Sequence, residues 1–231
     1  MKSIKNIIIV VIIVLTSICL LFINSGYQMY RKAIKEVGLT EKVSQITEKE
    51  NYTKLSEMPK IYLDAVIAVE DHRFYNHNGI DVISIGRAAF NDIRTLSFIE
   101  GGSTITQQLS KNVYFTQEKK IERKIAEVFM AFTFEKHYTK NEILELYLNT
   151  AYFGNGYYTV KEASQGYFDK EPKEMTDGEA IMLAGIPNAP SVYNPKVNLK
   201  LAKQRRNQVI KKMIKYKKLT QEEANKIIAE N

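Results

Sequence analysis

Residues 119–132 read KKIERKIAEVFMAF, and their apolar side chains recur with the period of an α-helix. These side chains stand at positions i, i+4, i+7, i+8 and i+11, which places them on one side of a helix. Because helical periodicity continues over nearly all of the chain beyond Leu55, we predict a mainly α-helical domain. The pattern also predicts one buried stripe on this long helix, formed by Ile121, Ile125, Val128, Phe129 and Phe132.

Three threonines indicate further helix starts. Each is followed three residues later by a glutamate, the capping-box pattern in which hydroxyl and carboxylate satisfy backbone amides at a helix N-terminus. Glycine and proline gather near residues 101–102, 154–156 and 185–195, where we expect loops between helices rather than strands. The three pairs are Thr139 with Glu142, Thr176 with Glu179, and Thr220 with Glu223.

The N-terminal region is strongly apolar. Residues 7–23 read IIIVVIIVLTSICLLFI, and the uncharged flank continues to residue 30. This length is enough to cross the hydrocarbon core of a bilayer, so we predict one transmembrane helix over residues 7–30. The basic residues on both sides of the run do not decide its orientation. A cleaved signal peptide is the alternative, but no A-x-A pattern follows the run, and Ile18 precedes Cys19 where a lipoprotein signal carries a small residue.

The rest of the chain divides near Leu55. Residues 31–54 are dominated by Glu, Lys, Ser and Thr, with sparse apolar side chains. Such a composition is typical of an exposed connection. We therefore expect an exposed stalk over residues 31–54 and a globular domain over residues 55–231.

The composition limits the classes of function. The 231 residues suffice for one ordinary domain, and the net charge of +7 favours anionic partners such as nucleic acid, phospholipid surfaces or diphosphate substrates. No recognition motif for nucleic acid accompanies this charge, so we expect no nucleic-acid partner. The single cysteine excludes an intramolecular disulfide, and the three histidines lack the spacing of zinc ligands.

Ionisable side chains concentrate in residues 65–81, AVIAVEDHRFYNHNGID. Glu70 and Asp71 end an apolar helix there, beside His72, Arg73 and His77. A carboxylate between apolar residues and cations is suited to general-base catalysis. The alternative is a solvated helix end whose charges pair with one another.

Residues 100–112, EGGSTITQQLSKN, combine a glycine turn with hydroxyl, amide and ammonium groups that suit sugar hydroxyls and phosphate. If Ser103 caps the following helix, the amides of the first turn also face an anion. An ordinary polar helix after a turn remains the alternative. No Walker motif is present, so a nucleotide site is not indicated.

Residues 119–127 and 140–149 supply the remaining candidates. Arg123 and Glu127 share a helix face, which indicates either an exposed ion pair or part of a cationic diphosphate site with Lys119 and Lys124. The sequence leaves both open. In KNEILELYLN, residues 140–149, we expect mostly core side chains, Tyr147 among them.

Taken in order, these segments resemble the glycosyltransferase family of peptidoglycan polymerases, found at the front of bifunctional penicillin-binding proteins and in monofunctional transglycosylases. The likeness extends from Leu55 to about Met213 and departs from the family at Thr159, where many relatives carry glycine. The SxxK and KTG signatures of a transpeptidase do not occur, so we expect a monofunctional enzyme without transpeptidase activity. The matching stretches are EDHRFYNHNGID, GGSTITQQLSKN, RKIAE, KNEILELYLN, AYFGNGYY, EAIMLAGIPNAPSVYNP and the pair Arg205 and Arg206.

The resemblance implies a lysozyme-like, mainly helical fold with two lobes on the outer face of the cytoplasmic membrane, with residues 1–6 as a cytoplasmic tail. It implies that Glu70 is the general base for a sugar hydroxyl of lipid II, and that Glu127 assists departure of the lipid diphosphate, directly or through a divalent cation such as Mg²⁺. No organic cofactor is expected. The implied substrate-binding residues are Asp71, Arg73, Phe74, His77, Ser103, Thr104, Gln107, Gln108, Lys111, Lys119, Arg123 and Lys124.

The expected partners are lipid II, the growing lipid-linked strand, the bilayer and other proteins of cell-wall synthesis. Two other functions remain as alternatives: a lysozyme-like hydrolase that uses water as acceptor, and an inactive membrane-anchored scaffold. The cations Lys111, Lys119 and Arg123 favour diphosphate departure, which a hydrolase does not need. The sequence leaves open the metal requirement, the oligomeric state, and whether residues 82–99 insert into the bilayer.

Overall fold

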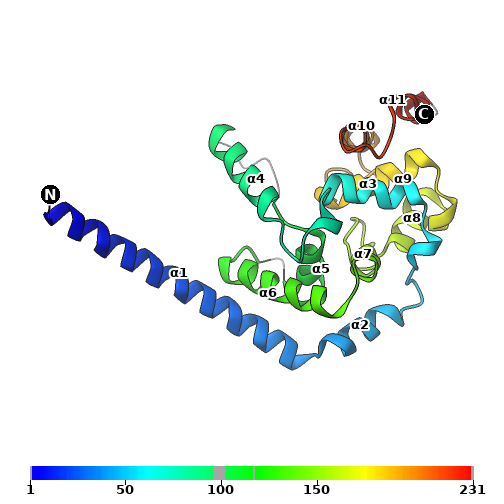
Figure 1. Ribbon diagram of the computed structural model, residues 1–231. Coiled ribbons are helices and arrows are strands. Elements are labelled where there is room, and N and C mark those ends of the chain that lie inside the picture. Colours follow the sequence, from blue (N-terminus) through cyan, green and yellow to red (C-terminus); the bar gives the residue numbers. More distant parts are fainter. Residues whose placement is uncertain (1, 96–101, 117, 230–231) are drawn as a thin grey trace.

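The computed structural model describes residues 2–95, 102–116 and 118–229, and in these ranges the regular structure is helical, without a strand. The predicted mainly α class is therefore confirmed. Figure 1 shows the arrangement. The α-helices are α1 (Lys2–Glu36), α2 (Leu39–Thr47), α3 (Lys60–Glu70), α4 (Val82–Thr95), α5 (Ile105–Tyr114), α6 (Ile121–His137), α7 (Lys140–Leu148), α8 (Val160–Phe168), α9 (Asp177–Gly185), α10 (Leu199–Lys215) and α11 (Gln221–Ala229). Four single turns of 3₁₀ helix are η1 (Leu55–Glu57), η2 (Phe74–Asn76), η3 (Pro172–Glu174) and η4 (Ile186–Asn188).

The predicted capping boxes begin three of these helices. Thr139 and Thr176 are the N-caps of α7 and α9, and each hydroxyl accepts a hydrogen bond from the backbone of the glutamate three residues on. Thr220 makes the same reciprocal pair with Glu223 before α11. Local hydrogen bonding therefore fixes these helix starts.

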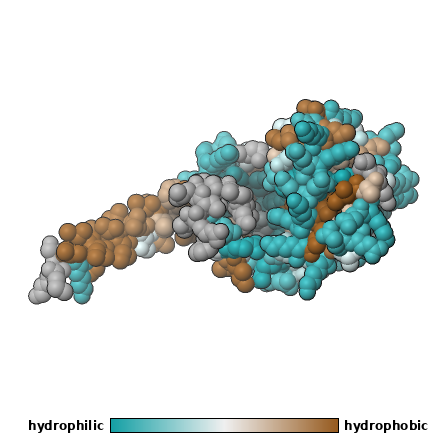
Figure 2. Space-filling model, turned by 90° about the horizontal axis from the view of Figure 1, so that it is seen from above, coloured by the Kyte–Doolittle hydropathy of each residue, from teal (hydrophilic) through white to brown (hydrophobic). Residues whose placement is uncertain are grey.

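Helix α1 is a single helix of 35 residues whose N-terminal part projects away from the domain (Figure 1). Its segment Ile4–Glu36, whose most apolar 18 residues have a mean hydropathy of 3.1, is the one helix in the described residues long and apolar enough to cross a membrane. The projecting part carries exposed isoleucine, valine and leucine side chains, seen as the brown rod in Figure 2. Such a surface is costly in water and suited to lipid.

The C-terminal part of α1 packs against α6. Gly26 is buried, and Tyr27 and Tyr30 place their rings 5.2 and 5.9 Å from the ring of Phe129. The hydroxyl of Tyr30 also lies 3.0 Å from that of Thr133. The apolar helix and the domain are thus joined by packing as well as by the chain.

The apolar stripe predicted on α6 was expected to be buried in the core, and this prediction is wrong. The helix forms as expected, but Ile121 is 61% exposed and Phe132 is 42% exposed. The side chains of α6 that enter the core include Met130 and Phe134, on a neighbouring face. Periodicity found an apolar face correctly, but part of that face meets α1 instead of the core.

The expectation of an exposed stalk over residues 31–54 is also wrong for part of that segment. Leu39 and Ile46 of α2 are buried in the core, and Val43 packs beside them. The backbone N–H of Thr53 donates to Oδ1 of Asn149 at 2.8 Å. Apolar residues spaced three to four apart give α2 a packing face despite its polar composition.

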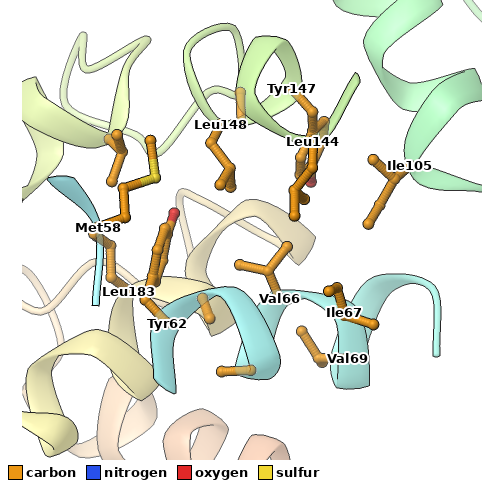
Figure 3. Packing of buried hydrophobic residues seen from close by; sticks show 14 of the residues in the cluster. Met58, Tyr62, Val66, Ile67, Val69, Ile105, Leu144, Tyr147, Leu148 and Leu183 are labelled. Atoms are coloured by element: carbon orange, nitrogen blue, oxygen red, sulfur yellow. The ribbon is translucent and has the colours of Figure 1, made fainter. Parts of the chain in front are cut away.

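The core surrounds α3. Tyr62 and Val66 of α3, Leu144 and Leu148 of α7, and Leu183 of α9 belong to one cluster of buried side chains (Figure 3). Helix α10 packs against α3 and α9 as well. Because close packing leaves little freedom of movement, the C-terminal end of α3 is held in a fixed place.

Helix α4 begins with exposed apolar side chains, Val82, Ile83 and Ile85. Residues 96–99, the end of the segment for which membrane insertion was considered, lie outside the described residues. The start of α4 therefore presents an apolar surface to its surroundings.

Candidate active site

Two adjacent carboxylates at the end of α3 have different surroundings. Asp71 is buried, and its Oδ2 lies 2.9 Å from Nε2 of His77 and accepts the backbone N–H of Ile105 at 3.1 Å. It therefore ties the end of α3 to the start of α5. Glu70 is only partly buried. Because the carboxylate of Asp71 is engaged in structural contacts, Glu70 is the carboxylate of this pair that is suited to catalysis.

Glu70 is held by an amide. Nε2 of Gln108 donates to Oε2 of Glu70 at 2.8 Å, and Oε1 of Gln108 accepts the hydroxyl proton of Tyr147 at 3.2 Å. Within the described part of the chain, no hydrogen bond reaches Oε1 of Glu70. One oxygen of this carboxylate is thus oriented by Gln108 while the other has no donor among the described residues, an arrangement that suits a general base.

The start of α5 differs from the prediction at Ser103. The N-cap is Thr104, whose hydroxyl accepts the backbone N–H of Gln107 at 3.1 Å, while Oε1 of Gln107 accepts the N–H of Thr104 at 3.0 Å. Thr104 and Gln107 are buried in this cap. The sequence contained the signal, because Gln107 lies three residues after Thr104 and completes a capping box that Ser103 cannot form.

Glu127 on α6 is the second candidate carboxylate, and its side chain is 1% exposed. It pairs with the guanidinium of Arg123 and, at 2.9 Å, with Nζ of Lys124. Lys124 also donates to the hydroxyl of Ser103 at 2.6 Å, which joins α6 to the entry of α5. The alternative of an ordinary exposed ion pair is therefore wrong for Glu127.

Lys111 on α5 connects the two carboxylates electrostatically. Burial lowers the pKa of its ammonium group, the carboxylates of Glu127 and Glu70 oppose that shift, and the cations Lys124 and Arg123 add to it. No hydrogen bond from Lys111 is present among the described residues. The ammonium is thus within electrostatic reach of both glutamates and available to an anionic ligand.

Other predicted residues lie at the edge of this cluster or are used for structure. Arg73 donates from Nε to Oδ2 of Asp81 at 3.0 Å. Phe74 is fully buried, with Nζ of Lys140 4.4 Å from its ring centroid. Lys119 is exposed, and within the described ranges no contact joins it to Glu127 or Lys111.

The donor set does not fit a divalent cation in this arrangement. Both oxygens of Glu127 are already engaged by cationic side chains. No group of three or more His, Cys, Asp or Glu residues that could hold a metal ion occurs in the part of the chain that the structure describes. Hard divalent cations need several oxygen ligands, and Glu127 in this arrangement does not offer a free one.

Tyr147 and Asp81 were missed from the sequence. Tyr147 lies in an apolar stripe, where a tyrosine is indistinguishable from a core aromatic until its hydroxyl has a partner. Asp81 is buried, and its carboxylate accepts hydrogen bonds from the side chains of Arg73 and Ser84. Its only sequence signal is its position two residues after Gly79, just before α4.

Comparisons with known proteins identify the family of the chain. Residues 38–214 match the family model described as Transglycosylase. The chain is 46% identical over 170 residues to penicillin-binding protein 1F of Bacillus subtilis, covering 74% of the chain and 24% of that protein. It is 46% identical over 189 residues to penicillin-binding protein 1A of Vibrio cholerae, covering 81% of the chain and 23% of that protein.

A crystal structure of penicillin-binding protein 1A from Haemophilus influenzae matches with a TM-score of 0.47 and 27% identity, over 78% of this chain and 17% of that one. The chain thus spans about a quarter of the length of the two curated relatives, at 24% and 23%. The family match covers the residues that form the cluster around Glu70, Lys111 and Glu127. The chain therefore belongs to the transglycosylase family, as a peptidoglycan glycosyltransferase module of the penicillin-binding protein type.

Proposed function

We propose that the protein polymerises lipid II into β-1,4-linked glycan strands and releases undecaprenyl diphosphate. The observation that carries this proposal is that both carboxylates are joined to α5: Gln108 of α5 donates to Glu70 at 2.8 Å, and Lys124, which pairs with Glu127, donates to Ser103 at the entry of α5. A proton acceptor and a set of cations are thereby close to one another. A sugar hydroxyl that must lose a proton and a diphosphate that must leave need these two features together.

In the proposed reaction, Glu70 takes the proton from the 4-hydroxyl of the N-acetylglucosamine of the acceptor. The oxygen then forms a bond to the anomeric carbon of the growing strand, while the bond from that carbon to the diphosphate oxygen breaks. The electron pair leaves with the diphosphate, and displacement from the opposite side inverts the anomeric centre. The resulting bond is the β-1,4 linkage.

Lys111, Arg123 and Lys124 would stabilise the charge that develops on the diphosphate. Glu127 would act by holding Arg123 and Lys124, because both of its oxygens are engaged with them. Its buried negative charge also keeps these cations together, since like charges at such short range repel strongly.

The apolar helix supports a membrane-bound enzyme. Both substrates carry lipid chains, so an anchor restricts enzyme and substrates to the same surface and raises their effective concentration. We propose that α1 crosses the cytoplasmic membrane once, with the catalytic domain on the outer side.

A lysozyme-like hydrolase is the second candidate, because a partly buried carboxylate also suits hydrolysis. Hydrolysis of a neutral glycosidic bond needs no cluster of cations at the leaving group. The arrangement of Lys111, Arg123 and Lys124 therefore favours transfer from a diphosphate.

The test is incubation of the purified full-length protein, in detergent, with labelled lipid II. We expect polymer on a gel from the wild-type protein and none from the Glu70→Gln variant at equal fold stability. Release of short muropeptides from finished cell wall, with no polymer from lipid II, would contradict the proposal and support the hydrolase. Wild-type polymerisation by Glu70→Gln would contradict the assignment of the base.

A further inference from the structure

The hydrogen bonds around Glu70 continue one step beyond the carboxylate. Gln108 donates to Glu70 with its amide nitrogen and accepts from Tyr147 with its amide oxygen, at 2.8 and 3.2 Å. The three side chains come from α3, α5 and α7. They form a continuous chain from the core to the carboxylate.

The orientation of the Gln108 amide follows from its two partners. An ionised carboxylate only accepts hydrogen bonds, so the NH₂ end of the amide must face Glu70. The oxygen of the amide then faces Tyr147 and needs a donor. A phenol hydroxyl supplies that donor, so the two hydrogen bonds fix both the rotamer of Gln108 and the end that it presents.

Tyr147 is well suited to this part. It is 2% exposed, and its ring belongs to the core cluster between α3 and α7 (Figure 3). Burial, followed by the negative charge of Glu70, raises the pKa of Tyr147 well above the ordinary value. The hydroxyl therefore keeps its proton at any pH at which the enzyme works and remains a donor.

We propose that Tyr147 is a positioning residue for the base: through Gln108, it keeps a hydrogen-bond donor on Glu70. This inference rests on the proposed function, in which Glu70 removes a proton. Without the hydroxyl, Gln108 loses one of two restraints, and its hydrogen bond to Glu70 is formed for less of the time. A carboxylate that loses a hydrogen-bond donor is less well oriented and its charged form is less stabilised, so the pH dependence of activity is the property that should change.

Other charged groups near Glu70 stay in place in this scheme. Lys111 from α5 faces Glu70 electrostatically, and α6 contributes Glu127, Arg123 and Lys124 around Lys111. None of these groups is hydrogen-bonded to Tyr147 in the described structure. Removing the Tyr147 hydroxyl therefore changes the donor on Glu70 without changing the cations.

The experiment measures polymerisation of lipid II against pH for the full-length Tyr147→Phe protein. We expect kcat to fall about fivefold on the acidic limb of the pH profile, with KM little changed, because about one hydrogen bond of stabilisation is lost. The acidic limb should move to higher pH by about 0.7 unit, which corresponds to the same factor of five, so that the deficit shrinks as the pH rises.

The matched control is Tyr62→Phe. Tyr62 is also fully buried, but its hydroxyl has no hydrogen-bond partner among the described residues. The Tyr62→Phe substitution removes a phenol hydroxyl from the same core, so a shift of the pH profile caused by altered packing alone would appear in both variants. We expect the Tyr62→Phe profile to match that of the wild type.

A double-mutant cycle with Gln108→Ala tests the route of the effect. If Tyr147 acts through Gln108, then Tyr147→Phe adds no further shift in the Gln108→Ala background. Gln108→Ala alone removes the donor itself, so its acidic limb should be displaced at least as far, and it carries the test if Tyr147→Phe does not fold.

An unshifted profile for Tyr147→Phe, an equal shift for Tyr62→Phe, or additive shifts in the cycle would overturn the positioning role while the polymerase function stands. A wild-type protein that makes no polymer at any pH would instead overturn the proposed function, and this inference with it.

Discussion

Gly26 of α1 lies directly against Ile125 of α6. A Cβ atom at position 26 would come within 2.6 Å of the Cβ of Ile125 and 2.8 Å of the backbone oxygen of Glu122. The absence of a side chain at Gly26 is therefore what allows the apolar helix to approach the helix that carries Glu127. Close helix approach at small residues is common where a helix leaves a membrane.

Gly26→Ala is expected to loosen the contact between α1 and α6. Alanine favours a helix over glycine, but the clash with Ile125 outweighs this gain, and overpacking of this kind costs about 1–3 kcal/mol. Thermal unfolding of the full-length protein in detergent measures the loss. Gly38→Ala is the matched control, because nothing lies within 4 Å of a Cβ at that position. Equal stability of the two variants would contradict the packing role of Gly26.

Lys111→Gln is expected to lower kcat for lipid II polymerisation by about a hundredfold, because a preplaced cation at the leaving group is lost. Lys120→Gln is the comparison, since Lys120 is exposed and pairs with Glu118 at 2.7 Å. That variant should stay within about twofold of wild type, as exposed pairs contribute little. Similar losses in both variants would indicate a general effect of charge rather than a defined site.

Asp81 should make the stability of the fold depend on acid pH. Burial alone would raise the pKa of Asp81, but hydrogen bonds from Ser84 and the guanidinium of Arg73 hold it below its ordinary value of 3.8. Because the pKa of Asp81 is lower in the folded state than its ordinary value, the ionised carboxylate stabilises the fold at pH values above that ordinary value. This stabilisation is lost as the pH falls through the folded-state pKa.

Asp81→Asn should therefore be less stable than wild type at neutral pH, by about 1–2 kcal/mol, and the difference should narrow in acid. Unfolding followed between neutral pH and pH 3 measures this. Asp177→Asn, at an exposed position on α9, serves as the control. A difference that stays constant with pH would contradict the role of the Asp81 carboxylate.

Tyr62→Phe is expected to keep or raise the free energy of unfolding, by up to about 1 kcal/mol. The hydroxyl of Tyr62 is buried without a hydrogen-bond partner among the described residues, so its removal relieves a desolvation cost at nearly constant volume. Chemical denaturation gives the value. A clear loss of stability would show that the hydroxyl has a partner, such as a buried water.

Features that depend on neighbours in the chain could be predicted from the sequence. The capping boxes at Thr139, Thr176 and Thr220 need only residues three positions apart, and the mainly helical class follows from periodicity. Ser103 was considered as a possible cap of α5, whereas the cap is Thr104, which the same local rule identifies when Gln107 is included.

Features that depend on residues distant in the chain could not be predicted from the sequence. The face of α6 that enters the core was misassigned because α1, about a hundred residues earlier, covers the competing face. The role of Tyr147 needs Gln108, 39 residues away, and Gln108 needs Glu70, 38 residues away. A stripe of apolar residues contains no information about these pairings until the helices are packed.

Because α1 is one uninterrupted helix from its apolar start to Glu36, the membrane anchor proposed above would be joined rigidly to the domain. Each residue in such a helix advances about 1.5 Å and turns by about 100°. Insertion of a single residue between Ile23 and Gly26 would therefore both shift the domain along the helix axis and rotate it about that axis. In the proposed membrane-bound enzyme, the number of residues in this short interval would set the orientation of the active site relative to lipid-linked substrates.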